Sequence, residues 1–480
     1  MKKLPFKILA SLMIFVLIMA SCKLDYTKLP TDVATADKSG HSYVVTSQEF
    51  NGWFSSGKVS KDGLVSPANS INFPTNNTNN DFNKWSQQMF LWITSPKDNT
   101  IVLETPEFYT VSPSYSNETK RNLISHPTTK SKTASGVGKS DTEEDQATSN
   151  VLLASIGNGE DNSLVYYITY VNDMYAQFLQ AGKSDTIKYP NILFPTTKKE
   201  LYSIEAFALN QKPPHKILNP ETLTMELKTS WVDLATIPIT EHGNYIQIPA
   251  EVPIFDRSSN TIWKKTGTTK KIQLALLGMH VVGSVKGHPE MIWATFEHQS
   301  NSPNLAYNYI DKSGKTNTVS ADTGNHWLLN SNSADIVYNK SHMTYKKDTI
   351  VVTLSNTISP SNTKRVHAFG NIDTISDANS QIIAFNNSSR NQLISGDVRK
   401  NYIFIGAIWT SDGKLPTKTN SNLRGNTALA NSTMETNYQK NSSNCFSCHT
   451  SKLNPNAAYD LSHIYSLLLE GEILSLNTPN

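Results

Sequence analysis

The segment GMHVVGSVKGHPEMIWATFEHQSNSPN, residues 278–304, decides the predicted fold. It holds two runs rich in β-branched and aromatic residues, separated by a short stretch with glycine, a pattern typical of two strands joined by a tight turn. We therefore predict a β-hairpin. His280 and His298 lie on its two strands and His288 lies in the turn, so the hairpin could gather histidines at one end of a sheet.

Similar strand signals continue on both sides of this hairpin, from about residue 220 to about residue 410. Each run is rich in β-branched or aromatic residues and is bounded by Gly, Pro, Asn or Asp; the runs are 222–234, 244–255, 270–285, 290–298, 348–358 and 401–409. These runs predict an antiparallel β core. No repeat of fixed period is visible, which argues against a propeller or a solenoid.

Two helices are predicted ahead of this core. The first covers residues 81–94 and stops before Pro96; its apolar residues at helical spacing are Trp85, Met89, Trp92 and Ile93. The second covers residues 163–181, where the shared face is Leu164, Ile168, Val171, Tyr175 and Phe178. We assign the aromatic residues of both helices to the core.

The N-terminus has the pattern of an export signal. Lysines precede an apolar run, and Ala20 and Ser21 stand directly before Cys22, as in the lipobox of bacterial lipoproteins. We expect residues 1–21 to be removed and Cys22 to carry lipid, which anchors the chain to a membrane in the cell envelope, at the periplasmic face or the outer membrane. An ordinary signal peptide or a short membrane anchor with a chance cysteine is the alternative.

Net charge excludes one class of partner. The chain has a formal net charge of +3, and removal of residues 1–21 takes away three lysines and no acidic residue, which leaves 0. No basic block with interleaved aromatic residues remains, so we expect no nucleic-acid partner. We further expect residues 22–43 to be a flexible tether and the polar stretch 107–150 to be an exposed insertion.

The motif CFSCH, residues 445–449, holds the two cysteines that lipidation leaves. Its spacing is that of a c-type haem attachment site, in which two thiols bond the porphyrin edge and the adjacent histidine binds iron. We therefore predict one covalently attached haem c, with Cys445 and Cys448 as attachment points and His449 as the proximal iron ligand. Export agrees with this, because covalent haem attachment takes place outside the cytoplasm.

Three rival interpretations of Cys445 and Cys448 agree less well with the sequence. A thioredoxin-like motif needs a βαβ context that the polar flanks lack. A zinc site wants four ligands, and only His463 follows the motif. A disulfide across two residues closes almost no loop and stabilises little.

The residues around this motif are predicted to be helical, over 428–440 and 458–474. The predicted fold class is thus α+β, with a mainly antiparallel β body, flanking helices and a short helical C-terminal haem-binding segment. The β body is expected to cover residues 44–425 and the cytochrome c-like haem segment residues 426–480. Because this segment is short for an independent cytochrome domain, we expect the haem to lie against the β body.

The second iron ligand decides between electron transfer and chemistry at an open iron. Met434 could supply a thioether and His463 a second imidazole, and either would give a closed, electron-carrying haem. Each residue also has a plainer interpretation: Met434 fills the core, and His463 packs against its neighbours or faces solvent. A ligand from the β body, or an open site, completes the alternatives.

Residues of the hairpin form a candidate catalytic group. Glu297 beside His298 could orient it or carry a proton, and His280 could join them from the neighbouring strand. The plainer interpretation is that these side chains are solvated or hydrogen-bonded at strand ends.

Four segments, NKWSQQMFLWITSP, GMHVVGSVKGHPEMIWATFEH, LANSTMET and CFSCH, together resemble a group of poorly characterised bacterial cytochrome c family proteins, exported or lipid-anchored, with one haem motif near the C-terminus. The resemblance implies covalent haem at Cys445 and Cys448, iron ligation by His449 and a redox role. It supplies no substrate or redox partner. No methionine follows Met434, so the usual methionine position of small cytochromes c does not carry over.

Three functions follow as expectations. The first is a lipid-anchored monohaem cytochrome that transfers single electrons. The second is a haem-dependent, peroxidase-like oxidoreductase with an open iron covered by the β body and served by His280, Glu297 and His298. The third is a surface binding protein in which the haem is structural or sensing.

Overall fold

The computed structural model describes the chain from residue 28 onward, with gaps. The described ranges are 28–73, 79–113, 120–126, 142–143, 150–156, 162–184, 193–324, 326–330, 337–371, 376–417, 422–439, 443–450, 461–469 and 471–475. The predicted signal peptide, residues 1–21, and Cys22 lie outside these ranges. No helix within them is long and apolar enough to cross a membrane.

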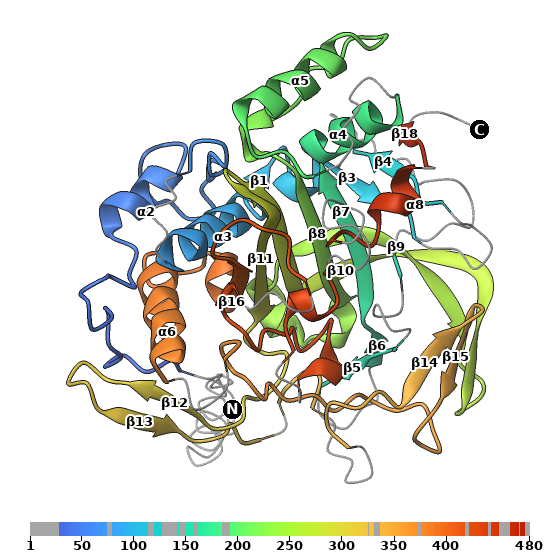
Figure 1. Ribbon diagram of the computed structural model, residues 1–480. Helices are drawn as coiled ribbons and strands as arrows, with labels where there is room; N and C mark the ends of the chain where they lie inside the picture. The colour runs from blue at the N-terminus through green and yellow to red at the C-terminus, as the bar shows by residue number, and fades with distance from the viewer. Residues whose placement is uncertain are drawn as a thin grey trace, which may run out of the picture.

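A twelve-stranded sheet forms the centre of the protein (Figure 1). Its main path runs through β17 Leu423–Gly425, β16 Tyr402–Thr410, β11 His288–His298, β10 Ile262–Val285, β8 Met225–Asp233, β7 Tyr166–Asn172, β3 Phe108–Val111, β4 Leu123–Ser125 and β18 Ile473–Ser475. The N-terminal half of the long strand β10 also pairs with β9 Gln247–Asp256 and with β15 Thr349–Val352, which forms a hairpin with β14 Met343–Lys346. Neighbouring strands in this sheet are antiparallel apart from β18, which runs parallel to β4.

Shorter elements surround the sheet. Three two-stranded ribbons pair β1 Pro96–Lys97 with β2 Thr100–Ile101, β5 Leu153–Ser155 with β6 Asn162–Leu164, and β12 Tyr307–Ile310 with β13 Thr316–Val319. The helices are α2 Ser47–Trp53, α3 Asn79–Ile93, α4 Asp173–Lys183, α5 Lys198–Leu209, α6 Ser376–Arg390 and α8 Tyr465–Leu469. Single 3₁₀ turns are η1 Val102–Glu104, η2 Pro220–Thr222, η3 Leu234–Thr236, η4 Ile239–Asn244, η5 Val398–Asn401, η6 Thr436–Tyr438 and η7 Cys445–Ser447.

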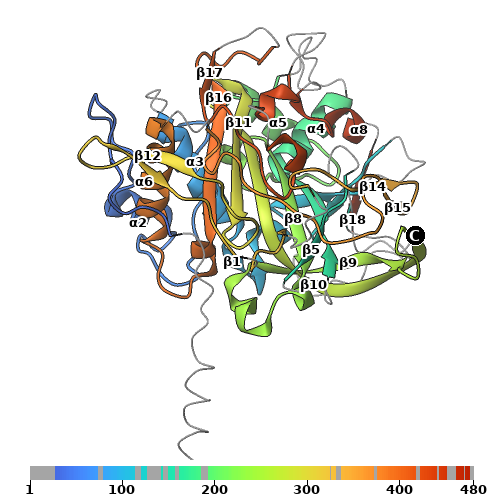
Figure 2. The same ribbon diagram turned by 90° about the horizontal axis from the view of Figure 1, so that it is seen from below.

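The two faces of the central strands differ in what covers them. Side chains alternate across a sheet, so Met279 and its partner Phe296 point to one face, and Phe296 stacks on Phe90 of α3 at 4.3 Å between ring centroids. His280 and its partner Thr295 point to the other face, where the C-terminal segment lies. Figure 2 shows α2, α3 and α6 on one side of the sheet and the red C-terminal segment on the other. The face toward α3 is therefore apolar, whereas the opposite face carries polar side chains beside apolar ones such as Val282 and Trp293.

The predicted strands and the first helix are confirmed. Each of the six predicted runs contributes a strand, and β10 and β11 form the predicted hairpin around Gly287, whose positive φ of 76° suits the turn. Helix α3, Asn79–Ile93, matches the predicted 81–94 to within two residues at each end, and its four predicted core residues are buried. The α+β class of the prediction is therefore confirmed.

The second predicted helix is wrong over its first half. Residues 166–172 form the central strand β7, and only Asp173–Lys183 is helical. Every residue of β7 is buried, so its apolar residues do not alternate and their spacing resembles that of a helix. Asn172 ends the strand and caps the helix, because its side chain accepts the Tyr175 N–H at 3.0 Å.

The exposed insertion predicted over 107–150 is wrong where the structure describes it. Strands β3 and β4 both belong to the main sheet, and β3 is fully buried. The polar residues here are paired inside the protein: Thr110 bonds His126 at 3.0 Å, and Arg121 donates to the Ser112 carbonyl at 2.6 Å. Polar composition therefore did not mean exposure, since buried polar groups can satisfy one another. Residues 114–119, 127–141 and 144–149 lie outside the described ranges.

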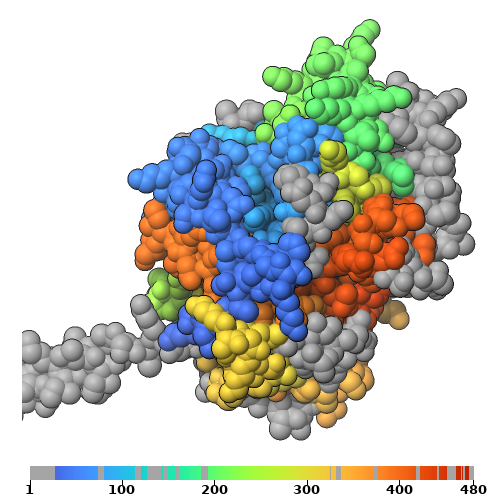
Figure 3. All heavy atoms as spheres, turned by 60° about the vertical axis from the view of Figure 1, so that its left-hand side comes forward, coloured from blue at the N-terminus to red at the C-terminus, as the bar shows by residue number. Residues whose placement is uncertain are grey.

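The predicted tether is also partly wrong. Val33 is buried and bridges Asp311, and the Ala34 N–H donates to the Ile310 carbonyl at 2.9 Å. Figure 3 shows the dark-blue N-terminal residues packed against the yellow region that contains β12 and β13. Residues 28–43 are thus part of the folded body.

The predicted helical C-terminal segment requires a fourth correction. Residues 428–439 form turns and the 3₁₀ turn η6. Of the second predicted helix, the described residues include the short helix α8, while Ile473–Ser475 is strand β18; residues 458–460 and 470 lie outside the described ranges. The reason lies in the side chains of Asn431, Ser432 and Thr433, which hydrogen-bond to the sheet or to the local backbone, a competition that disfavours helix.

Candidate haem-binding site

The 3₁₀ turn η7 places both thiols of the CFSCH motif on one side. In a 3₁₀ turn, side chains three residues apart are eclipsed, so Cys445 and Cys448 face the same way. Asn444 begins the turn, because its side chain accepts the Phe446 N–H at 3.0 Å and donates to the Thr427 carbonyl at 3.0 Å. The two cysteines are free thiols, not a disulfide, in the structure.

His449 is held in the orientation that a metal ligand needs. Its Nδ1–H donates to the Leu461 carbonyl at 2.6 Å, which leaves Nε2 as the nitrogen that can bind a metal. Its ring contacts Trp293 at 4.3 Å and stacks on His463 at 4.1 Å, both between ring centroids. Burial, followed by the nearby His463, lowers the pKa of His449 to about 3. The imidazole is therefore neutral at neutral pH, the form that coordinates iron.

A cavity joins this motif to the sheet. Its volume is about 200 Å³, smaller than the roughly 300–1,000 Å³ of typical small-molecule and cofactor sites, and it is partly open to solvent. Apolar side chains form much of the wall, from Val282, Trp293, Ala294, Leu429 and Ala430. The groups with metal or acid–base chemistry that line it are His280, Met434, Glu435, Cys445, Cys448, His449 and His463.

These residues fit a covalent haem. Two thiols on one side, a neutral imidazole with one oriented nitrogen, and apolar walls are the features by which a c-type site holds the porphyrin and iron. Within the described ranges, no three His, Cys, Asp or Glu side chains gather as ligands of a bare metal ion. Both predicted second-ligand candidates, Met434 and His463, line the cavity, so proximity alone does not choose between them.

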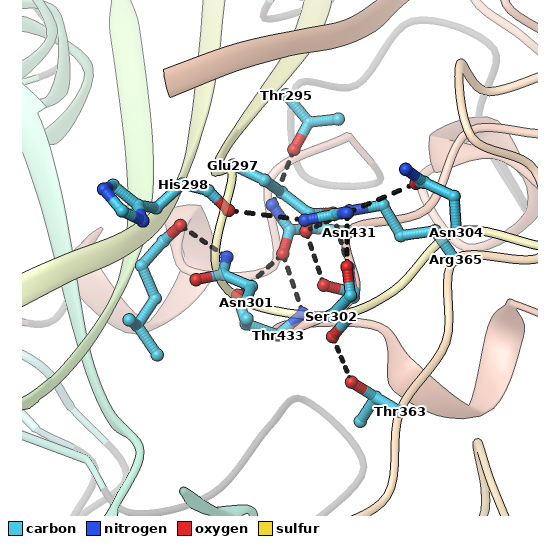
Figure 4. Close-up of polar contacts among 12 residues, drawn as sticks. Thr295, Glu297, His298, Asn301, Ser302, Asn304, Thr363, Arg365, Asn431 and Thr433 are labelled. Atoms are coloured by element: carbon cyan, nitrogen blue, oxygen red, sulfur yellow. Dashed lines mark hydrogen bonds and ion pairs between the residues drawn. The ribbon is translucent and has the colours of Figure 1, made fainter. Parts of the chain in front are cut away.

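The predicted catalytic group does not assemble. Glu297 and His298 are consecutive on β11 and point to opposite faces of the sheet. His298 stacks on Tyr245 at 3.9 Å between ring centroids, and burial lowers its pKa to about 3, so its imidazole is neutral near pH 7. Figure 4 shows its ring turned away from the polar cluster around Glu297. Of the three predicted residues, only His280 lines the cavity.

Glu297 instead forms a buried ion pair with Arg365 (Figure 4). Arg365 Nε lies 2.9 Å from Glu297 Oε2, and Arg365 also donates to the Ser302 carbonyl at 2.6 Å. The Ser432 N–H donates to Glu297 Oε1 at 2.7 Å. Both charged side chains are almost fully buried. This cluster fastens the C-terminal segment to the sheet two residues before Met434.

Neighbouring contacts extend this attachment. Asn431 Nδ2 donates to Thr295 Oγ1 at 2.9 Å, and Tyr167 Oη donates to the Thr433 carbonyl at 2.7 Å. Gly278 of β10 lies under this contact, where a Cβ would come within 2.9 Å of Asn431 Nδ2 and Thr433 Oγ1. The close approach of the segment to the sheet therefore depends on glycine at this position.

A new partner for His280 appears on the same segment. His280 Nε2 lies 2.7 Å from Glu435 Oε1, and the Asn431 N–H donates to Glu435 Oε2 at 2.9 Å. Sequence analysis missed Glu435 as a site residue. The available signal was that His280, Thr295 and Glu297 stand at positions that share one face of β10 and β11. Together with the polar segment LANSTMET, they indicate polar contacts between that face and the segment.

A second attachment gives the protein a pH-dependent stability. Ser462 Oγ donates to Glu226 on β8 at 2.5 Å, and burial raises the pKa of Glu226 to about 7. The contribution of Glu226 to stability is therefore full below pH 4.5 and is lost as the pH rises through 7. We expect Glu226→Gln to have a higher free energy of unfolding than the parent, and this gain should be about 2 kcal/mol larger at pH 8 than at pH 5. Partial exposure of Glu226 makes the difference smaller than full burial would. Urea unfolding at both pH values measures this, and a pH-independent difference would contradict it.

Comparisons with models of protein families, with curated proteins and with solved structures found no match to this chain.

Proposed function

We propose that this protein is an exported, lipid-anchored c-type cytochrome that carries one covalent haem and transfers single electrons in the cell envelope. The observation that supports it most is that Cys445, Cys448 and His449 line one cavity with an oriented, neutral imidazole. Haem, when bound, supplies the one-electron chemistry of iron. Cys445 and Cys448 would hold it covalently, His449 would bind iron through Nε2, and Trp293 would limit water beside His449.

The N-terminal pattern supports the location. Lysines, an apolar run and Ala-Ser-Cys up to Cys22 are the features of a lipoprotein signal, and export places the cysteines of the haem motif where such haem attachment takes place. We propose the membrane, through lipid on Cys22, and an unidentified redox protein as partners.

A haem-dependent oxidoreductase is the second candidate. One observation favours it: His280 and its carboxylate partner Glu435 line the same cavity. The pair has the composition of an acid–base group. Glu297 and His298 add nothing to this candidate, because one is held in a buried ion pair and the other faces away from the cavity.

Production of the full chain in a bacterium able to mature c-type cytochromes tests the proposal. We expect a coloured protein whose mass exceeds the apoprotein by one haem, and a colourless Cys445→Ala/Cys448→Ala variant of apoprotein mass, because no thioether can form. Ser447→Ala, between the two cysteines, is the matched control and should keep the haem. A parent protein that stays colourless at apoprotein mass would contradict the proposal.

A further inference from the structure

The cavity holds three side chains that could face iron besides His449. Met434 and His463 come from the C-terminal segment, and His280 comes from the central strand β10. Their contacts in the structure differ, and these contacts rank them.

Met434 packs in a hydrophobic cluster. It is 1% exposed and belongs to a small hydrophobic cluster with Leu152, Leu277 and Leu329. Its neighbours along the chain are tied to the sheet, so the thioether has little freedom to leave this cluster. A buried methionine with such contacts behaves as core filler.

His463 lies face to face with His449. The two rings are 4.1 Å apart between centroids and inclined by 17°. Two imidazoles that bind one iron from opposite sides point their nitrogens at each other across the metal, so stacked rings cannot do this. His463 would have to leave the stack before it could serve.

His280 already has the surroundings of a metal ligand. One ring nitrogen, Nε2, is bonded to Glu435 Oε1 at 2.7 Å, and the other oxygen of Glu435 is fixed by the Asn431 N–H. A carboxylate on one ring nitrogen orients a histidine and makes the other nitrogen a better donor to a metal. His280 also stands on a central strand, which is more rigid than a loop.

We infer that His280 is the second protein ligand of the iron and that Glu435 is its positioning residue. The inference rests on the proposed function, since it needs the haem to be present. It makes the site bis-histidine, with ligands supplied by the sheet and by the CFSCH motif, and it favours electron transfer over chemistry at an open iron.

Spectroscopy of the haem-loaded full chain tests it. We expect the parent to be low-spin and to bind no carbon monoxide when reduced, and His280→Ala to become high-spin and to bind carbon monoxide. Added imidazole should return His280→Ala to the low-spin form, which separates a lost ligand from a misfolded site. His41→Ala, at an exposed histidine, is the matched control for loss of a histidine.

Glu435→Gln provides the second arm. The neutral amide still orients His280, but it increases electron donation from the other ring nitrogen less than the carboxylate does. We therefore expect a low-spin haem with a raised reduction potential. A high-spin parent that binds carbon monoxide, a low-spin His280→Ala, or an unchanged potential in Glu435→Gln would each overturn the inference. A colourless parent protein would instead overturn the proposed function, so the two failures are distinguishable.

Discussion

Replacing Arg365 by leucine should destabilise the protein by about 3–5 kcal/mol, because it leaves the carboxylate of Glu297 buried without its charged partner. Glu297 is 0% exposed, so water cannot replace the guanidinium. The substitution also removes the hydrogen bonds that Arg365 donates to the Ser302 and His298 carbonyls in the same cluster. Urea unfolding followed by tryptophan fluorescence measures the change.

A double variant shows how much of this loss comes from the unpaired charge. In Glu297→Gln/Arg365→Leu no charge remains buried, so we expect it to recover part of the stability that Arg365→Leu loses. The interpretation fails if Arg365→Leu costs less than about 1 kcal/mol, or if the double variant is as unstable as the sum of the two single variants.

Replacing Gly278 by alanine should detach the C-terminal segment from the sheet. The new Cβ would lie 2.9 Å from both Asn431 Nδ2 and Thr433 Oγ1 and 3.0 Å from Ser230 Oγ, so these side chains must shift and their contacts between segment and sheet are disturbed. We expect a loss of about 1–3 kcal/mol from overpacking. We also expect faster hydrogen exchange over residues 429–439 and a lower yield of haem-loaded protein, since this segment carries one wall of the cavity.

Gly283→Ala is the matched control on the same strand. A Cβ there meets Trp85 of α3 at 3.0 Å, on the opposite face of the sheet. It should disturb the packing of α3 and leave exchange in the C-terminal segment unchanged. Equal exchange in the two variants would show that Gly278 has no special relation to the segment.

Local patterns in the sequence predicted much of the fold. The six strand runs, the hairpin at Gly287 and helix α3 were predictable because each depends on residues close together in the chain. The prediction failed at β7, where burial of both faces removes the alternation that marks a strand. It also failed at 107–150, where polar residues are buried in pairs.

The same distinction between local and long-range information applies to the candidate site. Cys445, Cys448 and His449 were predicted as a group because the motif is contiguous and has the spacing of a haem attachment site, and all three line one cavity. The grouping of His280 with Glu297 and His298 was not, because neighbours on a strand face opposite ways.

The sequence alone predicted the strand segments, and it contains the CFSCH motif and the Ala-Ser-Cys pattern behind the haem and lipoprotein predictions, because each is a property of residues within a few positions of one another. Only the tertiary structure decided that Glu435 pairs with His280, 155 residues away, and that Arg365 pairs with Glu297, 68 residues away. Such pairs depend on which face of the sheet the C-terminal segment covers. That choice is made by packing and hydrogen bonding among distant parts of the chain, and it leaves no periodic signal in the sequence.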